Sequence, residues 1–179
     1  GGVIMGIHFD NLDAITRKFM LEESKLGGHY ISPRLTPEGQ AAWKSVLEDA
    51  IQSHNEDWLA TELLRRNFIR SHETYTRSGK IFEKRINQPH AAQQLAEGEF
   101  NRYYLRGLCV RAKNEGKQFV EIYCGKQVSQ PRLESEAKIG TKVDVQVLLV
   151  TLRDNDFVTF EDAFGVPGGP NSGLTARLS

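Results

Sequence analysis

The densest run of chemically capable residues lies between positions 97 and 106, which hold two glutamates, two arginines and two tyrosines. On a helix, Glu99 and Arg102 are three residues apart and Arg102 and Arg106 four, so these side chains share one ridge. Tyr103 is expected beside that ridge with its hydroxyl free. Arginine and tyrosine are common anchors of protein interfaces, and they also suit phosphate contacts and base stacking. A core helix with an internal ion pair on its polar side explains the same spacing.

The segment 65–85 is the second candidate site, because it combines seven basic residues with only two acidic ones, a net charge of +5. Aromatic residues, Tyr75 among them, are interleaved with the cations. Such a segment can hold nucleic acid by counterion release and base stacking, or an acidic protein surface. The basic residues are Arg65, Arg66, Arg70, Arg77, Lys80, Lys84 and Arg85.

Opposite charges are separated along the chain. Residues 10–64 carry ten acidic and five basic residues, a net charge of −5, whereas the whole chain has 23 of each sign. A balanced total provides no overall field to recruit nucleic acid or an anionic membrane. Acidic and basic surfaces on one small protein can instead pair between copies and build a ring or filament. We therefore expect a non-enzymatic homo-oligomer first, and a nucleic-acid-binding protein that uses residues 65–85 second.

An enzyme of the nuclease or hydrolase type is the third expectation. Glu136-Ala137-Lys138 matches the minimal Glu-x-Lys pattern of metal-dependent nucleases, and Glu97 or Glu99 would supply another carboxylate. Arg102 would complete the site. This hypothesis requires the side chains to converge on one cleft with perturbed titration.

The remaining reactive residue types lack the spacing of familiar sites. The five histidines are dispersed, the two cysteines are distant from each other, and no Gly-x-Ser-x-Gly occurs. The glycine-rich stretch 165–173 lacks the Lys-Ser/Thr of a phosphate-binding loop. We therefore expect no metal and no cofactor, with Cys109 and Cys124 reduced.

The location of the protein is expected to be cytoplasmic. Residues 1–7 are apolar but lack the basic start and the length of a signal peptide. No apolar run approaches the roughly 18 residues of a membrane span, so no membrane partner is expected.

Three helices are expected in the first third of the chain. The first begins at a cap on Asp10 or Asn11 and ends near residues 27–28. The second has Thr36 as its cap and Pro37 at its first position, and the third runs from Asn55 to residues 65–66. Across Ser78-Gly79, residues 75–77 and 80–82 are compatible with a hairpin or with a mobile basic loop.

The second half combines a long helix with short strands. The helix opens at Pro89 and stops at Gly116, and Gly98 suggests a kink or a split. Residues 118–123 and 157–160 are expected as strands, while 143–152 fits either state and β-branching slightly favours a strand.

These elements predict an α+β fold, built as an N-terminal helical layer (1–66), a basic arm or hairpin (67–88), and a long helix with a small, mostly antiparallel sheet (89–179). A Gly/Pro-rich loop lies near the C-terminus. A chain of 179 residues is long enough to form a real core, and we expect one compact domain overall.

Overall fold

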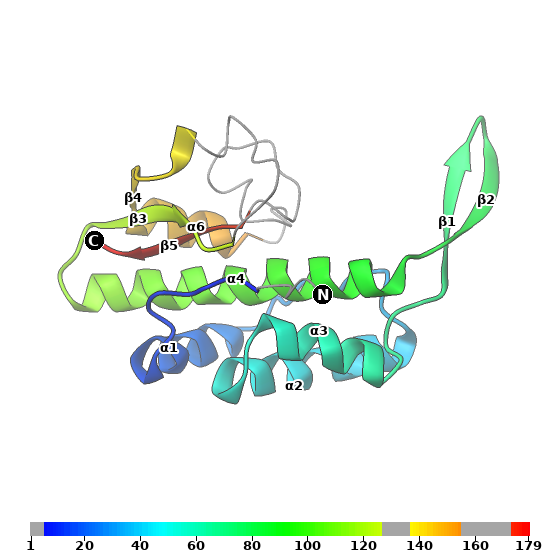
Figure 1. Cartoon of the computed structure of the whole chain (residues 1–179), viewed down its shortest axis with the longest axis horizontal. Helices are drawn as coiled ribbons and strands as arrows, with labels where there is room; N and C mark the ends of the chain where they lie inside the picture. The colour runs from blue at the N-terminus through cyan, green and yellow to red at the C-terminus, as the bar shows by residue number, and fades with distance from the viewer. Residues whose placement is uncertain (1–5, 127–136, 155–172) are drawn as a thin grey trace, which may run out of the picture.

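The computed structural model describes residues 6–126, 137–154 and 173–179 of the chain. The fold is α+β, as predicted (Figure 1). Within these residues the elements are α1 (Ala14–Ser24), α2 (Pro37–Ser53), α3 (Glu56–Arg65), β1 (His72–Arg77), β2 (Lys80–Arg85), α4 (Gln88–Asn114), β3 (Phe119–Cys124), β4 (Lys142–Asp144), α6 (Val145–Leu152) and β5 (Leu174–Leu178).

Helix α4 is the centre of the molecule. Figure 1 shows it between two layers, with α1, α2 and α3 on one side and the small sheet with α6 on the other. Because both sides are covered, α4 is buried around most of its circumference, including Phe100, Tyr104 and Leu108. The hydrophobic core therefore lies along this helix.

Local capping explains where the N-terminal helices begin. Thr36 accepts a hydrogen bond from the Gly39 backbone N–H (3.0 Å), as predicted for α2. Helix α1 is capped by Asp13, and the predicted caps Asp10 and Asn11 were wrong. Both side chains bind the C-terminal strand instead. Asp10 pairs with Arg177 at 3.2 Å, and Asn11 accepts from the backbone N–H of Leu178 at 2.9 Å.

Gly98 neither kinks nor splits α4, which is continuous over 27 residues. A glycine inside a helix costs about 1 kcal/mol relative to alanine. Packing from both layers along the length of α4 outweighs that cost, so the predicted interruption does not occur.

The small sheet has the strand order β4-β3-β5, with both pairs antiparallel. Strand β3 confirms the prediction for residues 118–123. The preference for a strand over 143–152 was wrong for most of that segment, because β4 ends at Asp144 and α6 begins at Val145. The Asp144 carboxylate accepts from the backbone N–H groups of Gln146 (2.9 Å) and Val147 (3.1 Å), which starts the helix.

The strand expected at 157–160 and nearly all of the glycine-rich loop lie outside the described residues. Cys109 and Cys124 are both free thiols, and burial raises the pKa of Cys109 to about 12. Among the described helices, none has both the length and the apolar character that crossing a bilayer requires.

Candidate interaction site

Strands β1 and β2 form a hairpin, one of the two predicted alternatives for this segment, which we call the arm (residues 72–85). Tyr75 is opposite Phe82 and Arg77 is opposite Lys80. The turn residues Ser78 and Gly79 both have positive φ angles, 52° and 75°. Two such residues make the tight turn whose twist matches that of the flanking strands, so the sequence closes the hairpin with the shortest common loop.

The arm stands away from the rest of the protein (Figure 1). Every residue of the arm except Glu73 is exposed, and Ile81 is 76% exposed. In the described part of the chain, the two strands pack extensively only against each other. An isolated two-stranded hairpin is at best marginally stable in water, and exposed apolar side chains on one favour a partner.

Alternation along the strands gives the arm two different faces. One face, which we call the aromatic face, has a stacked pair of rings at its middle, Tyr75 and Phe82, with centroids 5.5 Å apart. The ammonium of Lys84 lies over the Tyr75 ring at 5.6 Å. Cations therefore flank an aromatic pair on this face, which comprises Glu73, Tyr75, Arg77, Lys80, Phe82 and Lys84.

Three cations of the arm are unpaired. The side chains of Arg77, Lys80 and Arg85 make no hydrogen bond or ion pair with any described residue. Arg65 and Arg66, by contrast, both bind Glu62 at 2.7 Å at the end of α3. Hydrogen bonds from Arg65 and then Arg66 lower the pKa of Glu62 to about 2. Of the seven predicted basic residues, the unpaired ones are thus confined to the arm.

Arg34 and Arg70 hold the base of the arm. Arg34 donates two hydrogen bonds of 3.1 Å to the carboxylate of Glu73, which also lies 3.5 Å from Lys84. Arg70 donates from Nε to the carbonyl oxygens of Pro33 (3.2 Å) and Leu35 (3.0 Å). The base is therefore oriented by the body, while the outer part of the arm is free to meet another molecule.

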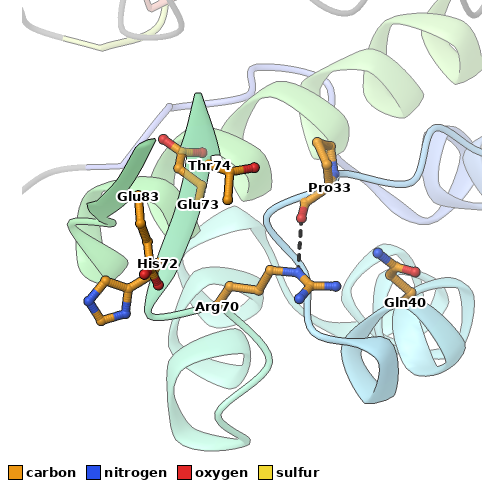
Figure 2. A pocket seen from close by; sticks show the side chains of 7 residues that line it. All are labelled: Pro33, Gln40, Arg70, His72, Glu73, Thr74 and Glu83. Carbon is orange, nitrogen blue, oxygen red and sulfur yellow. Dashed lines mark hydrogen bonds between the residues drawn. The ribbon is translucent and has the colours of Figure 1, made fainter. Parts of the chain in front are cut away.

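A pocket of about 420 Å³ lies where the arm joins the body. Figure 2 shows the Arg70 side chain reaching across it toward Pro33. The lining mixes Arg70 with carboxylates, without a cysteine or serine among the lining side chains. The residues are Pro33, Gln40, Arg70, His72, Glu73, Thr74 and Glu83.

The ridge predicted on α4 is not a surface. Arg102, Tyr103 and Arg106 are each buried, with no more than 4% of the residue exposed. The Tyr103 hydroxyl, predicted to be free, lies 3.2 Å from Nδ1 of His29. Arg102 donates to the backbone oxygens of Leu152 (3.0 Å) and Asp154 (2.6 Å). The predicted interface residues of α4 therefore belong to the core. The internal ion pair of the alternative interpretation is present, with Arg102 3.7 Å from Glu99, but it is buried and does not lie on a polar face.

Arg106 belongs to a buried ion cluster that joins three helices. Its Nε donates to Glu23 of α1 at 3.0 Å, and Arg153, at the end of α6, binds the same carboxylate at 2.8 Å. Burial alone would raise the pKa of Glu23, but the hydrogen bonds from Arg153 and Arg106 bring it below its ordinary value. The cluster therefore stabilises the packing of α1 and α6 on α4.

The glutamates of the enzyme hypothesis lie on different sides of α4. Residues two apart on a helix do not share a face. Glu97 binds Lys126 at 2.6 Å, whereas Glu99 is 3.7 Å from Arg102. Glu136 lies outside the described residues. The described residues thus do not bring Glu97 together with Glu99 and Arg102.

Two contributors to the site were missed by sequence reasoning. Arg34 lies on a loop nearly forty residues from its partner Glu73, and no local pattern signals that contact. Ile81 was assigned to the hairpin, but its exposure depends on the arm standing away from the core.

Among the described residues, no group of three or more His, Cys, Asp or Glu is placed to hold a metal ion. Comparison of the chain with protein-family models, with curated proteins and with solved structures found no match.

Proposed function

We propose that the protein is a self-assembling structural protein, in which the arm of one copy docks on the surface of a neighbouring copy. The observation that carries this proposal is an exposed arm with apolar side chains and three unpaired cations. A hairpin of this kind gains stability when a partner covers its rings and pairs its charges.

Charge separation favours a second copy as the partner. Three unpaired cations lie close together on the arm, whereas the helical layer has an acidic excess. Complementary patches on one chain produce a head-to-tail contact, which closes into a ring or extends as a filament. The proposal therefore accounts for both the basic arm and the acidic helical layer.

The test is sedimentation velocity of the full chain at moderate salt. The wild type is expected to form an oligomer, and Arg77→Glu/Lys80→Glu is expected to sediment as a monomer. Lys18→Glu/Lys117→Glu makes the same charge change away from the arm and should leave the oligomer intact. A wild-type chain that remains monomeric at its highest attainable concentration would discard the proposal.

Nucleic-acid binding is a second candidate, favoured by the aromatic face. Rings flanked by Lys84, Arg77 and Lys80 resemble the combination that holds single strands. This function predicts an affinity whose logarithm falls with log salt by about 0.7 to 0.9 for each neutralised phosphate. Absence of binding to DNA or RNA at low salt would remove it.

A further inference from the structure

We infer that the surface which receives the arm is the outer face of α2 on a neighbouring copy. The inference rests on the proposed self-assembly and names the partner surface. We define the outer face of α2 as the side turned away from its buried stripe of Trp43, Val46 and Leu47. It comprises Glu38, Ala41, Ser45, Glu48, Asp49 and Gln52.

This face provides carboxylates that have no partner of their own. The side chains of Glu38, Glu48 and Asp49 form no hydrogen bond or ion pair with any residue in the described ranges. Ala41 and Ser45 lie between them and leave room for a ribbon to approach closely. Lys44 and Asp49 lie on opposite flanks of this face, and Lys44 is one turn from Glu48. The outer face of α2 thus has acidic side chains at its two ends and small side chains in the middle.

The aromatic face of the arm has the opposite charge at its tip and rings at its middle. Arg77 and Lys80 are at the tip, the rings of Tyr75 and Phe82 follow, and Lys84 lies nearest the base beside Glu73. Successive pairs on one face of a strand are about 7 Å apart, so this pattern extends over about 14 Å.

The spacing on α2 is similar. Four residues of a helix rise about 6 Å, so Asp49, Ser45 and Ala41 follow at intervals of about 6 Å, and Glu38 lies about 16 Å from Asp49. Tip cations can therefore meet Glu48 and Asp49 while the rings cover Ser45 and Ala41. At the base, Lys84 is already paired with Glu73 and adds nothing to the charge match. Charge and size are therefore complementary at the tip and the middle of the arm.

The arm cannot make this contact within its own chain. Figure 1 shows it pointing away from the layer that contains α2. The contact is therefore between copies and joins two different surfaces, which is the head-to-tail arrangement.

Charge reversal on the two surfaces tests the inference. Glu48→Lys/Asp49→Lys should sediment as a monomer, and so should Arg77→Glu/Lys80→Glu. Mixed in equal amounts, the two variants should assemble, because each arm then meets a face of opposite charge. Glu22→Lys/Glu115→Lys adds the same charge elsewhere and should assemble alone, and circular dichroism with urea unfolding checks that every variant folds.

The outcomes separate the inference from the proposed function. If only the arm variant becomes monomeric and the α2 variant assembles normally, self-assembly stands and the assignment to α2 is wrong. If both variants are folded monomers and their mixture stays monomeric, the arm docks elsewhere and the inference is likewise overturned. A monomeric wild type overturns both.

Discussion

Arg34 and Glu73 join the body of the protein to the arm through two hydrogen bonds, each 3.1 Å long. Arg34 lies just before α2, and Glu73 is the second residue of β1. A bidentate pair fixes direction as well as distance. The arm is therefore held at its base in one orientation relative to the body.

Removal of this pair should loosen the arm without unfolding the protein. Arg34→Ala is expected to speed amide hydrogen exchange in residues 72–85, while the free energy of unfolding falls by less than about 1 kcal/mol, as for partly exposed ion pairs. Assembly should weaken because ordering the arm is then part of the cost of association. Arg65→Ala, which removes an ion pair on α3, is the control. Unchanged exchange in the arm of Arg34→Ala would contradict the tethering role.

The buried pair of Glu23 and Arg106 should contribute more to stability than any exposed pair. Arg106→Ala leaves a buried carboxylate with Arg153 alone, and we expect a loss of about 3 kcal/mol in the free energy of unfolding. Arg153→Ala should cost about 1 kcal/mol, because Arg153 is 40% exposed and Arg106 remains in place. Urea unfolding measures both variants. Equal losses in the free energy of unfolding for Arg106→Ala and Arg153→Ala would contradict the greater contribution of the buried pair.

Two glycines of α4 should respond in opposite directions to substitution by alanine. A Cβ at Gly98 would meet no atom within 4 Å, so Gly98→Ala should raise the free energy of unfolding by about 0.5–1 kcal/mol. A Cβ at Gly107 would lie 2.8 Å from the backbone nitrogen of Met20, where α1 crosses α4. Gly107→Ala should therefore destabilise the protein. Thermal unfolding of the two variants provides the comparison, and a stabilised Gly107→Ala would contradict the close approach of α1.

Local sequence signals were sufficient for most elements. The two short β-tolerant runs around Ser78-Gly79 predicted either a hairpin or a mobile loop, and the structure has the hairpin. Thr36 caps α2 as predicted, and α3 begins beside Asn55, where the third helix was expected, because an N-cap needs only residues within the next turn. Such interactions are visible in a short window of sequence.

The burial of Arg102 and Arg106 could not be predicted in the same way. Their partners are on α6 and α1, about 50 and 83 residues away, and each arginine looks like a surface residue until those elements pack on α4. Hydrophobic periodicity detects one covered face of a helix, whereas α4 is covered on both sides. The ridge was therefore assigned to the surface although its spacing was interpreted correctly.

The pH dependence of stability should reveal the second buried carboxylate cluster. Glu56, at the start of α3, is 2% exposed, and its Oε1 accepts from the backbone N–H of Ile7 at 2.9 Å. Its Oε2 is buried and has no hydrogen-bond partner among the described residues. Burial is the largest cause of a raised pKa of Glu56, and repulsion from Asp57 and Glu97 adds to it. The pKa is raised from 4.5 to about 7. Lys126 is bound to Glu97 and does not pair with Glu56.

This raised pKa makes the folded protein hold a proton that the unfolded chain releases near pH 4.5. The stabilisation that this protonated carboxyl gives the folded state is fully present below pH 4.5 and is lost as the pH rises through 7. The free energy of unfolding should therefore fall over that window. Glu56→Gln stays neutral and keeps the acceptor for Ile7. The variant should therefore lose about 2 kcal/mol less between about pH 5 and 7.5 than the wild type, as measured by urea unfolding at each pH. Glu62→Gln is the matched control, because Glu62 has a pKa of about 2 and is ionised throughout the window. Equal slopes for wild type and Glu56→Gln would show that Glu56 is ionised in the folded protein at pH 5.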